Sequence, residues 1–221
     1  KLLQVESLAG HNGWGFTAIR ERLRSGYQLK GPNWSIEALT YVSGTSVEPQ
    51  QSNVSHRTTF RSESLYLAGR NLVIGPRPAR VDLGSYGTML QDRLLQAVLG
   101  DSARGLSEVQ VGSDEFLEHY MVLVNDARDA EELLTLRVQG ALLALVAVKP
   151  VIKLTEQGLE VRLDQAYLSR EEDIKTLVQL GEALLDRFDH ATELVDAAEV
   201  VVGLALHLVG QGLDEVGAAE R

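Results

Sequence analysis

The segment from His56 to Arg80 holds the residues best suited to binding an anion. Its arginines are Arg57, Arg61, Arg70, Arg77 and Arg80, and its only acidic residue is Glu63. The arginine side chain ends in a planar fork of N–H donors that fits the oxygens of a phosphate or a carboxylate. Alternate residues of a strand point to the same face, so an extended segment would place Arg57 and Arg61 side by side. These five arginines and His56 are the candidate anion- or partner-binding residues.

Two interpretations of this segment stay open. In the first, the arginines hold a phosphate, a carboxylate or an acidic partner, and His56 lies near enough in sequence to act as acid or base on a small anionic substrate. In the second, the charges keep an exposed edge strand from pairing with other chains. The pattern favours the edge-strand interpretation, because that interpretation requires no ligand.

No other set of residues has the spacing of a known catalytic or metal site. The histidines are His11, His56, His119, His190 and His207, and none of their spacings matches a metal-binding motif. The segment 84–87 lacks the G-x-S-x-G spacing of a nucleophile elbow. The glycines of 10–15 are expected to end a helix and not to hold a phosphate. We therefore predict no catalytic residue, no metal and no cofactor, and the sequence favours a non-enzymatic protein.

The charge and composition of the chain narrow its partners and its setting. Its 221 residues carry 21 basic and 31 acidic side chains, a net charge of −10, which disfavours binding to nucleic acid. The absence of cysteine fits a reducing compartment, and we expect a cytoplasmic protein. The sequence has no apolar run of the roughly 18 residues that a membrane span needs, so we expect no direct membrane insertion within this chain. Because the chain begins at Lys1, a membrane tether upstream stays an alternative.

Hydrophobic periodicity predicts strands early in the chain and a mixture of helices and strands later. The predicted strands cover 27–31, 34–42, 57–64, 72–74, 109–111 and 116–124, and a hairpin covers 151–155 and 159–163. A first helix is predicted to end at about residue 8, and a core helix is predicted within 126–147. The other predicted helices cover 88–99, 170–188 and 194–209. The order lacks a regular alternation of strands and helices. We therefore predict an α+β fold, with packed helices on an antiparallel sheet and a helical C-terminus.

We expect a single α+β domain over 1–221. A β-rich part over 1–85 and a mixed part over 86–221 are its candidate subdivisions. The chain is long enough for one large hydrophobic core, and 44% of its residues are hydrophobic, as in ordinary globular proteins.

Four motifs of the chain resemble a loose group of uncharacterised bacterial proteins. They are Gly-Trp-Gly-Phe at 13–16, Gly-Pro-Asn-Trp-Ser-Ile-Glu at 31–37, Leu-Val-Ile-Gly-Pro-Arg at 72–77, and the pattern of Phe, Tyr, Val and Asp over 116–126. The resemblance spans most of the chain. It implies a soluble domain, which in some members follows predicted membrane helices, and it implies no activity and no catalytic residues.

These observations favour a non-enzymatic binding or assembly module of bacterial origin. A protein partner, or self-association, is expected to use the apolar helix predicted over 194–209. One alternative is an enzyme of unfamiliar type that holds a small anionic substrate near Arg57, Arg61 and Arg77. Another is the cytosolic domain of a membrane-tethered protein.

Overall fold

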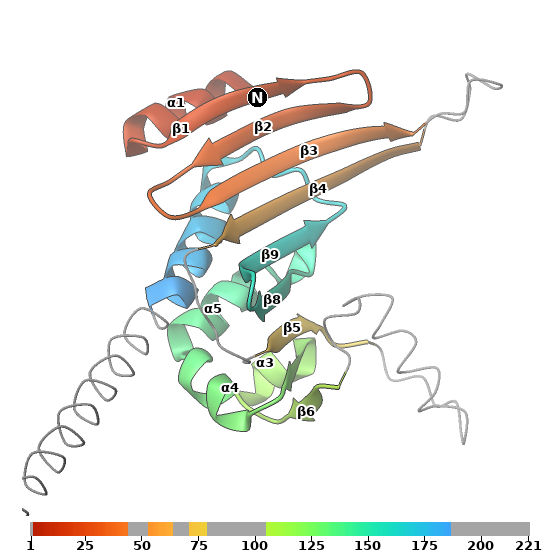
Figure 1. The fold of residues 1–221 in the computed structure, drawn as a ribbon, viewed down its shortest axis with the longest axis vertical. Coiled ribbons are helices and arrows are strands. Elements are labelled where there is room, and N and C mark those ends of the chain that lie inside the picture. Colours follow the sequence, from red (N-terminus) through yellow and green to blue (C-terminus); the bar gives the residue numbers. More distant parts are fainter. Residues whose placement is uncertain (1, 44–52, 64–70, 79–104, 187–221) are drawn as a thin grey trace, which may run out of the picture. The chain divides into compact units, whose positions relative to one another are not determined.

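One antiparallel sheet forms the centre of the protein in a computed structural model, which describes residues 2–43, 53–63, 71–78 and 105–186 (Figure 1). The strands are β1 (Gly15–Arg20), β2 (Arg24–Lys30), β3 (Ser35–Ser43), β4 (Asn53–Ser62), β5 (Leu72–Pro76), β6 (Ser107–Val109), β7 (Tyr120–Val124), β8 (Val151–Thr155) and β9 (Gly158–Asp164). The helices are α1 (Leu2–Asn12), α3 (Asp114–His119), α4 (Ala127–Leu133), α5 (Leu136–Ala144), the short 3-10 helix η3 (Val146–Val148) and a helix over 171–186.

The strand order mixes neighbours in sequence with distant segments of the chain. Within the described ranges the order is β1-β2-β3-β4-β9-β8-β5-β7-β6, and all eight pairings are antiparallel. The predicted α+β class with an antiparallel sheet is therefore confirmed. The predicted helices over 88–99 and 194–209 lie outside the described residues, as does the helical C-terminus.

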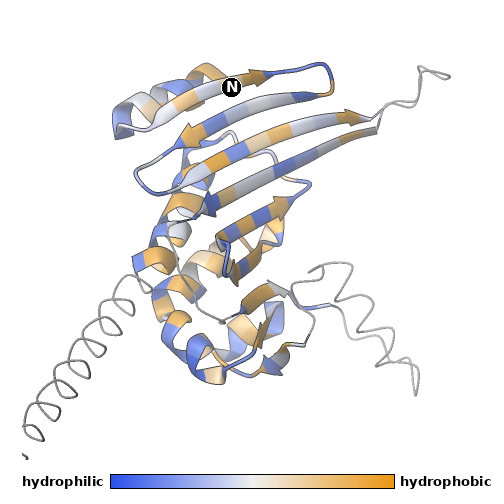
Figure 2. Ribbon diagram, viewed as in Figure 1, coloured by the Kyte–Doolittle hydropathy of each residue, from blue (hydrophilic) through white to orange (hydrophobic). Residues whose placement is uncertain are grey.

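A single row of apolar side chains crosses the sheet from one edge to the other. The pairing registers align one residue from each strand: Phe16, Leu29, Ile36, Phe60, Val161, Ile152, Ile74, Val122 and Val109. The seven inner members are 0% exposed. Figure 2 shows the matching alternation of hydrophobic and hydrophilic residues along the strands. This row marks one buried face of the sheet, because directly opposed residues in an antiparallel pair point to the same side. At β5 and β7 the opposite face is buried too, around Val73, Met121 and Leu123.

Helices and loops are bound to this buried face by polar side chains as well as by apolar packing. The Tyr27 hydroxyl donates to the carbonyl of Leu168 at 2.7 Å, and the Tyr120 hydroxyl donates to the carbonyl of Leu142 at 2.8 Å. Both tyrosine side chains are buried. Because each hydroxyl has its partner, these two rings can add their apolar area to the core without leaving a polar atom unsatisfied.

The helix over 171–186 packs against Phe60 through a glycine. A Cβ atom added to Gly181 would lie 2.1 Å from the ring of Phe60, closer than any real side-chain contact. Phe60 cannot easily move away, since it is fully buried and stacks on Trp34 with the ring centroids 5.6 Å apart. The buried residues of this helix include Ile174, Leu177, Leu180 and Leu184. They follow the predicted helical stripe, which is thereby confirmed up to residue 186.

The end of α1 is set by a glycine turn that leads directly into the sheet. Gly13 adopts a φ of 70°, a conformation that glycine reaches without steric cost. The amide of Gly13 donates to the carbonyl of Gly10, and the amide of Trp14 donates to the carbonyl of Ala9. This pair of bonds is a Schellman motif, and it confirms the predicted helix-ending turn. The chain then enters β1, a strand that the sequence pattern did not predict.

Two predictions between residues 114 and 148 were wrong. The first part of the expected strand over 116–124 is the helix α3, capped by the Ser113 hydroxyl, and only Tyr120–Val124 is a strand. The expected core helix within 126–147 is two helices, because the chain turns at Leu134 and Thr135 caps α5 anew. Leu136, expected in the core, is 83% exposed.

Replacement of Tyr27 by phenylalanine should reduce stability and flatten its decline at alkaline pH. Burial raises the pKa of the Tyr27 hydroxyl above its usual value of about 10. Above that pH, tyrosine ionises in the unfolded chain while Tyr27 stays neutral in the folded protein, so the free energy of unfolding falls as the pH rises. We expect Tyr27→Phe to cost about 1–2 kcal/mol at pH 7.

Urea unfolding at pH 7 and at several pH values above about 10 measures both effects. The variant should lose less stability than the wild type over the alkaline range, because its side chain has no proton to release. An equal decline in the free energy of unfolding of the two proteins at alkaline pH would contradict a raised pKa for the Tyr27 hydroxyl in the folded protein.

Two glycine-to-alanine substitutions should change stability in opposite directions. Gly181→Ala places a methyl group against Phe60, and we expect a loss of about 1–3 kcal/mol despite the better helix propensity of alanine. Gly140→Ala, at an exposed position of α5 with no atom within 4 Å of the added Cβ, should gain about 0.5–1 kcal/mol. Thermal and urea unfolding of the pair test this contrast. Similar shifts in both variants would mean that helix 171–186 does not pack on Phe60 as described.

Candidate binding surface

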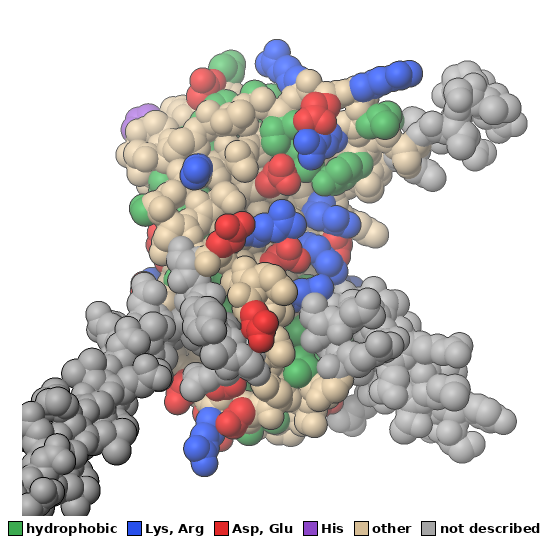
Figure 3. Space-filling model, in the orientation of Figure 1, with side chains coloured by type: hydrophobic (Ala, Val, Ile, Leu, Met, Phe, Trp, Pro, Cys, Tyr) green, Lys and Arg blue, Asp and Glu red, His purple; other side chains and the backbone are tan. Residues whose placement is uncertain are grey.

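Arg57 and Arg61 lie in the interior of the sheet and not at its edge. Both belong to β4, which pairs with β3 on one side and with β9 on the other. The interpretation that these charges protect an edge strand is therefore wrong for this strand. Their side chains project from the face opposite to Phe60, the face that lies toward the viewer in Figure 3.

Ion pairs join these arginines to the neighbouring strand. The register places Arg57 opposite Asp164 and Arg61 opposite Glu160. The Nε atom of Arg57 is 3.1 Å from Oδ1 of Asp164, and that of Arg61 is 3.1 Å from Oε2 of Glu160. Arg162 also pairs with Asp164, at 2.9 Å. The first two contacts link β4 to β9 across the surface of the sheet, and the third lies within β9.

We call this region the cationic face and define it by the charged, outward side chains of β4, β8 and β9. Its members are Arg57, Arg61, Lys153, Glu160, Arg162 and Asp164. Four cations thus stand against two carboxylates, in a chain whose net charge is −10. Figure 3 shows basic side chains gathered over the middle of the molecule, with acidic side chains among them.

The cationic face keeps donors for a ligand in spite of its ion pairs. Arg57 and Arg61 use their Nε atoms in the ion pairs, and in the described parts of the chain no hydrogen bond engages their terminal Nη atoms. Their side chains are 52% and 57% exposed. Lys153 has no ion pair with any described residue. These groups can therefore donate to the oxygens of an incoming anion.

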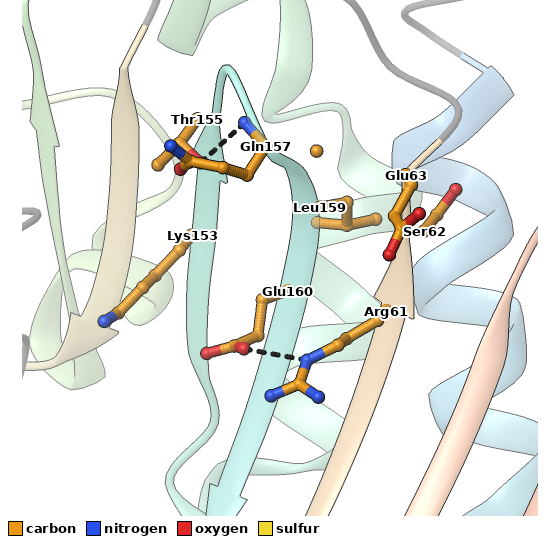
Figure 4. Close-up of a pocket in the computed structure, with 9 residues that line it drawn as sticks. Arg61, Ser62, Glu63, Lys153, Thr155, Gln157, Leu159 and Glu160 are labelled. Carbon is orange, nitrogen blue, oxygen red and sulfur yellow. Dashed lines mark hydrogen bonds and ion pairs between the residues drawn. The ribbon is translucent and has the colours of Figure 1, made fainter.

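An open hollow of ≈ 450 Å³ lies at one end of the cationic face (Figure 4). Arg61 comes from β4, Glu160 from β9 and Lys153 from β8, so Glu160 stands between two cations, and Glu63 adds a second carboxylate just after β4. The end of β4 and the turn between β8 and β9 form the remaining wall. Ser62, which also lines the hollow, donates its hydroxyl to the carbonyl of Asn33 at 2.6 Å. The lining suits a charged group better than an apolar one.

His56 lies on the other side of the sheet from the arginines. It is the neighbour of Arg57 in β4, and successive residues of a strand point to opposite faces. Its Nδ1 atom is 3.0 Å from the hydroxyl of Thr40, and its ring packs edge-on against Tyr167. The structure thus separates the candidate acid or base from the candidate anion-binding groups.

Arg77 occupies a structural position outside the cationic face. It follows β5, and its Nε atom donates to the carbonyl of Leu117 at 2.6 Å and to that of Tyr120 at 3.2 Å. Its Nη2 atom is 2.9 Å from Glu108. Arg77 therefore ties α3, β7 and β6 together. The remaining two candidates, Arg70 and Arg80, lie outside the described residues.

Lys153 and Arg162 belong to the surface but were not among the candidates. Both lie in the hairpin that the sequence predicted, where charged residues alternate with apolar ones. That alternation was the available signal. The pairing of this hairpin with β4 was not predictable, because about 100 residues of sequence separate the two segments.

Comparisons with protein-family models, with curated proteins and with solved structures find no match to this chain. Among the described residues, no helix is long and apolar enough to cross a membrane. Within the same residues, no group of three or more His, Asp or Glu side chains could hold a metal ion.

The structural and the surface arginines should differ in their contribution to stability. Arg77→Ala removes a partly buried guanidinium and leaves two backbone carbonyls without their donor, and we expect a loss of about 2–4 kcal/mol. Arg57→Ala and Arg61→Ala break exposed ion pairs, and each should cost about 1 kcal/mol or less. Urea unfolding of the three variants measures the difference. A cost at Arg57 or Arg61 as large as that at Arg77 would show that these surface residues are structural too.

Proposed function

We propose that the protein is a non-enzymatic binding module that holds an acidic segment of a protein partner on its cationic face. The observation that carries the proposal is the pair of half-exposed arginines on one strand, bound through Nε alone to the next strand. Their terminal nitrogens are left to donate to carboxylates of the partner. The separation of His56 from these groups supports binding over catalysis, because a base must reach the bound substrate.

The spacing of the cations favours an extended acidic segment over a single small anion. Arg57 and Arg61 are four positions apart on β4, and at about 3.3 Å per residue their Cα atoms are roughly 13 Å apart. While each Nε atom keeps its ion pair with β9, the two guanidinium groups stay about as far apart as their Cα atoms, and a single phosphate ion cannot contact both. A peptide with carboxylates on alternate residues presents its charges at intervals that can match those along a strand.

The two carboxylates of the face support selectivity. Glu160 and Asp164 orient the arginines through the ion pairs, and they also repel a ligand whose negative charge is continuous. A partner with spaced carboxylates avoids that repulsion. The net charge of −10 adds a long-range repulsion of nucleic acid. We place such a module in the bacterial cytoplasm.

Binding of a model acidic peptide tests this proposal. The probe is a fluorescently labelled peptide of about ten residues with alternating Glu and Ser, and fluorescence anisotropy measures its affinity. We expect Arg57→Gln and Arg61→Gln each to weaken binding about fivefold or more, and added salt to weaken it further. Arg170→Gln is the matched control, because it removes one exposed, ion-paired arginine away from the face.

The control should bind the peptide as the wild type does, within about twofold. Equal affinity in Arg57→Gln and Arg170→Gln, or no binding by the wild-type protein, would contradict the proposal. Displacement of the peptide by inorganic phosphate at a low concentration would favour a site for a small anion, as the enzyme hypothesis requires.

A further inference from the structure

The strand β1 forms one end of the sheet and offers an open edge. Of the strands in the described ranges, only β2 pairs with it. Thr17 and Ala18, at its centre, are exposed. Its sequence, Gly-Phe-Thr-Ala-Ile-Arg, contains no proline or lysine, and its one charge is at the end. The strand therefore lacks the proline and the central charge that commonly stop an edge from pairing with another chain.

The hairpin geometry identifies which backbone groups of β1 point outward. The amide of Glu21 donates to the carbonyl of Arg24 at 2.9 Å, so these residues form a hydrogen-bonded pair. Bonded and non-bonded pairs alternate along an antiparallel ladder, so the residues at 15, 17 and 19 bond to β2. The bonds of Gly31 to Trp34 and of Val42 to Leu23 agree with this assignment, because they direct the odd-numbered residues of β2 toward β3 and leave the even-numbered ones for β1. The N–H and C=O groups of Phe16, Ala18 and Arg20 therefore point away from the sheet.

We propose that β1 pairs with β1 of a second copy of this chain, antiparallel, about a two-fold axis at Ala18. In this register Ala18 lies opposite the partner subunit's Ala18, and Phe16 lies opposite the partner subunit's Arg20. All three outward N–H groups and all three outward C=O groups of each strand then form hydrogen bonds. A shift by two residues in either direction leaves one outward residue of each strand without a partner in the other. The strand is thus self-complementary in one register, as a two-fold interface requires.

The side chains opposed in this register are compatible. Arg20 has no ion pair with any described residue, and the ring of the partner subunit's Phe16 can receive its guanidinium. Thr17 meets the partner subunit's Ile19, a pair of β-branched residues that favours strand association. No like charges stand opposite each other within the strand. The pairing would join two nine-stranded sheets into one, on a surface separate from the cationic face.

Proline at position 18 tests the outward hydrogen bonds without breaking the ladder to β2. Ala18→Pro removes an N–H group that serves only the second copy. Sedimentation of the full 221-residue chain over a concentration series should show a dimer for the wild type. The dimer dissociation constant of the variant should be higher by about tenfold or more. Ala18→Ser keeps the N–H group and should dimerise as the wild type does. A wild-type protein that stays monomeric, or a proline variant that dimerises equally well, would overturn the proposal.

Disulfide cross-linking tests the register, since the chain contains no cysteine of its own. Opposed residues of a bonded pair have Cα atoms about 5.5 Å apart, within the range of a disulfide, so Ala18→Cys should give a covalent dimer on mild oxidation. Thr17→Cys lies diagonally from its equivalent, at about 7–8 Å, and should cross-link poorly. More cross-linking through position 17 than through position 18, or none at either, would overturn the proposal even if Ala18→Pro failed to fold. If the folded chain stays monomeric, the result contradicts self-pairing and favours an extended segment of another protein as the partner of β1.

Discussion

The row of apolar side chains that crosses the sheet is the constraint on which the other features depend. It takes one residue from each of the nine strands, and its inner members are fully buried. Burial of each such side chain contributes on the order of 1.5–3 kcal/mol. In β4 and β9, whose opposite face carries charged side chains, a slip of one residue would turn the member of the row toward water. The row therefore determines the register where β4 meets β9, two strands from distant parts of the chain.

The position of every surface group follows from that register. Because Phe60 must face the core, Arg57 and Arg61 must face the opposite side, and His56 must share the side of Phe60. The same parity places Glu160 and Asp164 beside the arginines. The ion pairs of the cationic face are thus a consequence of the buried row. They contribute little energy of their own, since exposed ion pairs contribute at most about 1 kcal/mol.

The layer that covers the buried face depends on close approach at a few positions. Gly181 brings helix 171–186 against Phe60, and the hydroxyls of Tyr27 and Tyr120 reach backbone carbonyls of the covering layer. Arg77 performs a similar task for α3, β6 and β7. Polar groups of this kind are bonded in proteins because an unsatisfied buried donor is costly. Arg77, one of the five arginines that the sequence suggested as binding residues, is consequently part of the scaffold and is not part of the binding surface.

The sequence by itself determined the local elements whose signals are short-range. The glycine turn after α1, the hairpin of β8 and β9 and the apolar stripe of 171–186 follow from residue periodicity and turn chemistry over a few residues. Only the tertiary structure decided that the hairpin inserts between β4 and β5, because strand partners distant in sequence are selected by packing and not by local preference. That insertion made β4 an interior strand, brought Lys153 and Arg162 to its arginines and left β1 as the open edge. The short helix α3 was missed because the cap at Ser113 outweighed the strand preference of the residues after it.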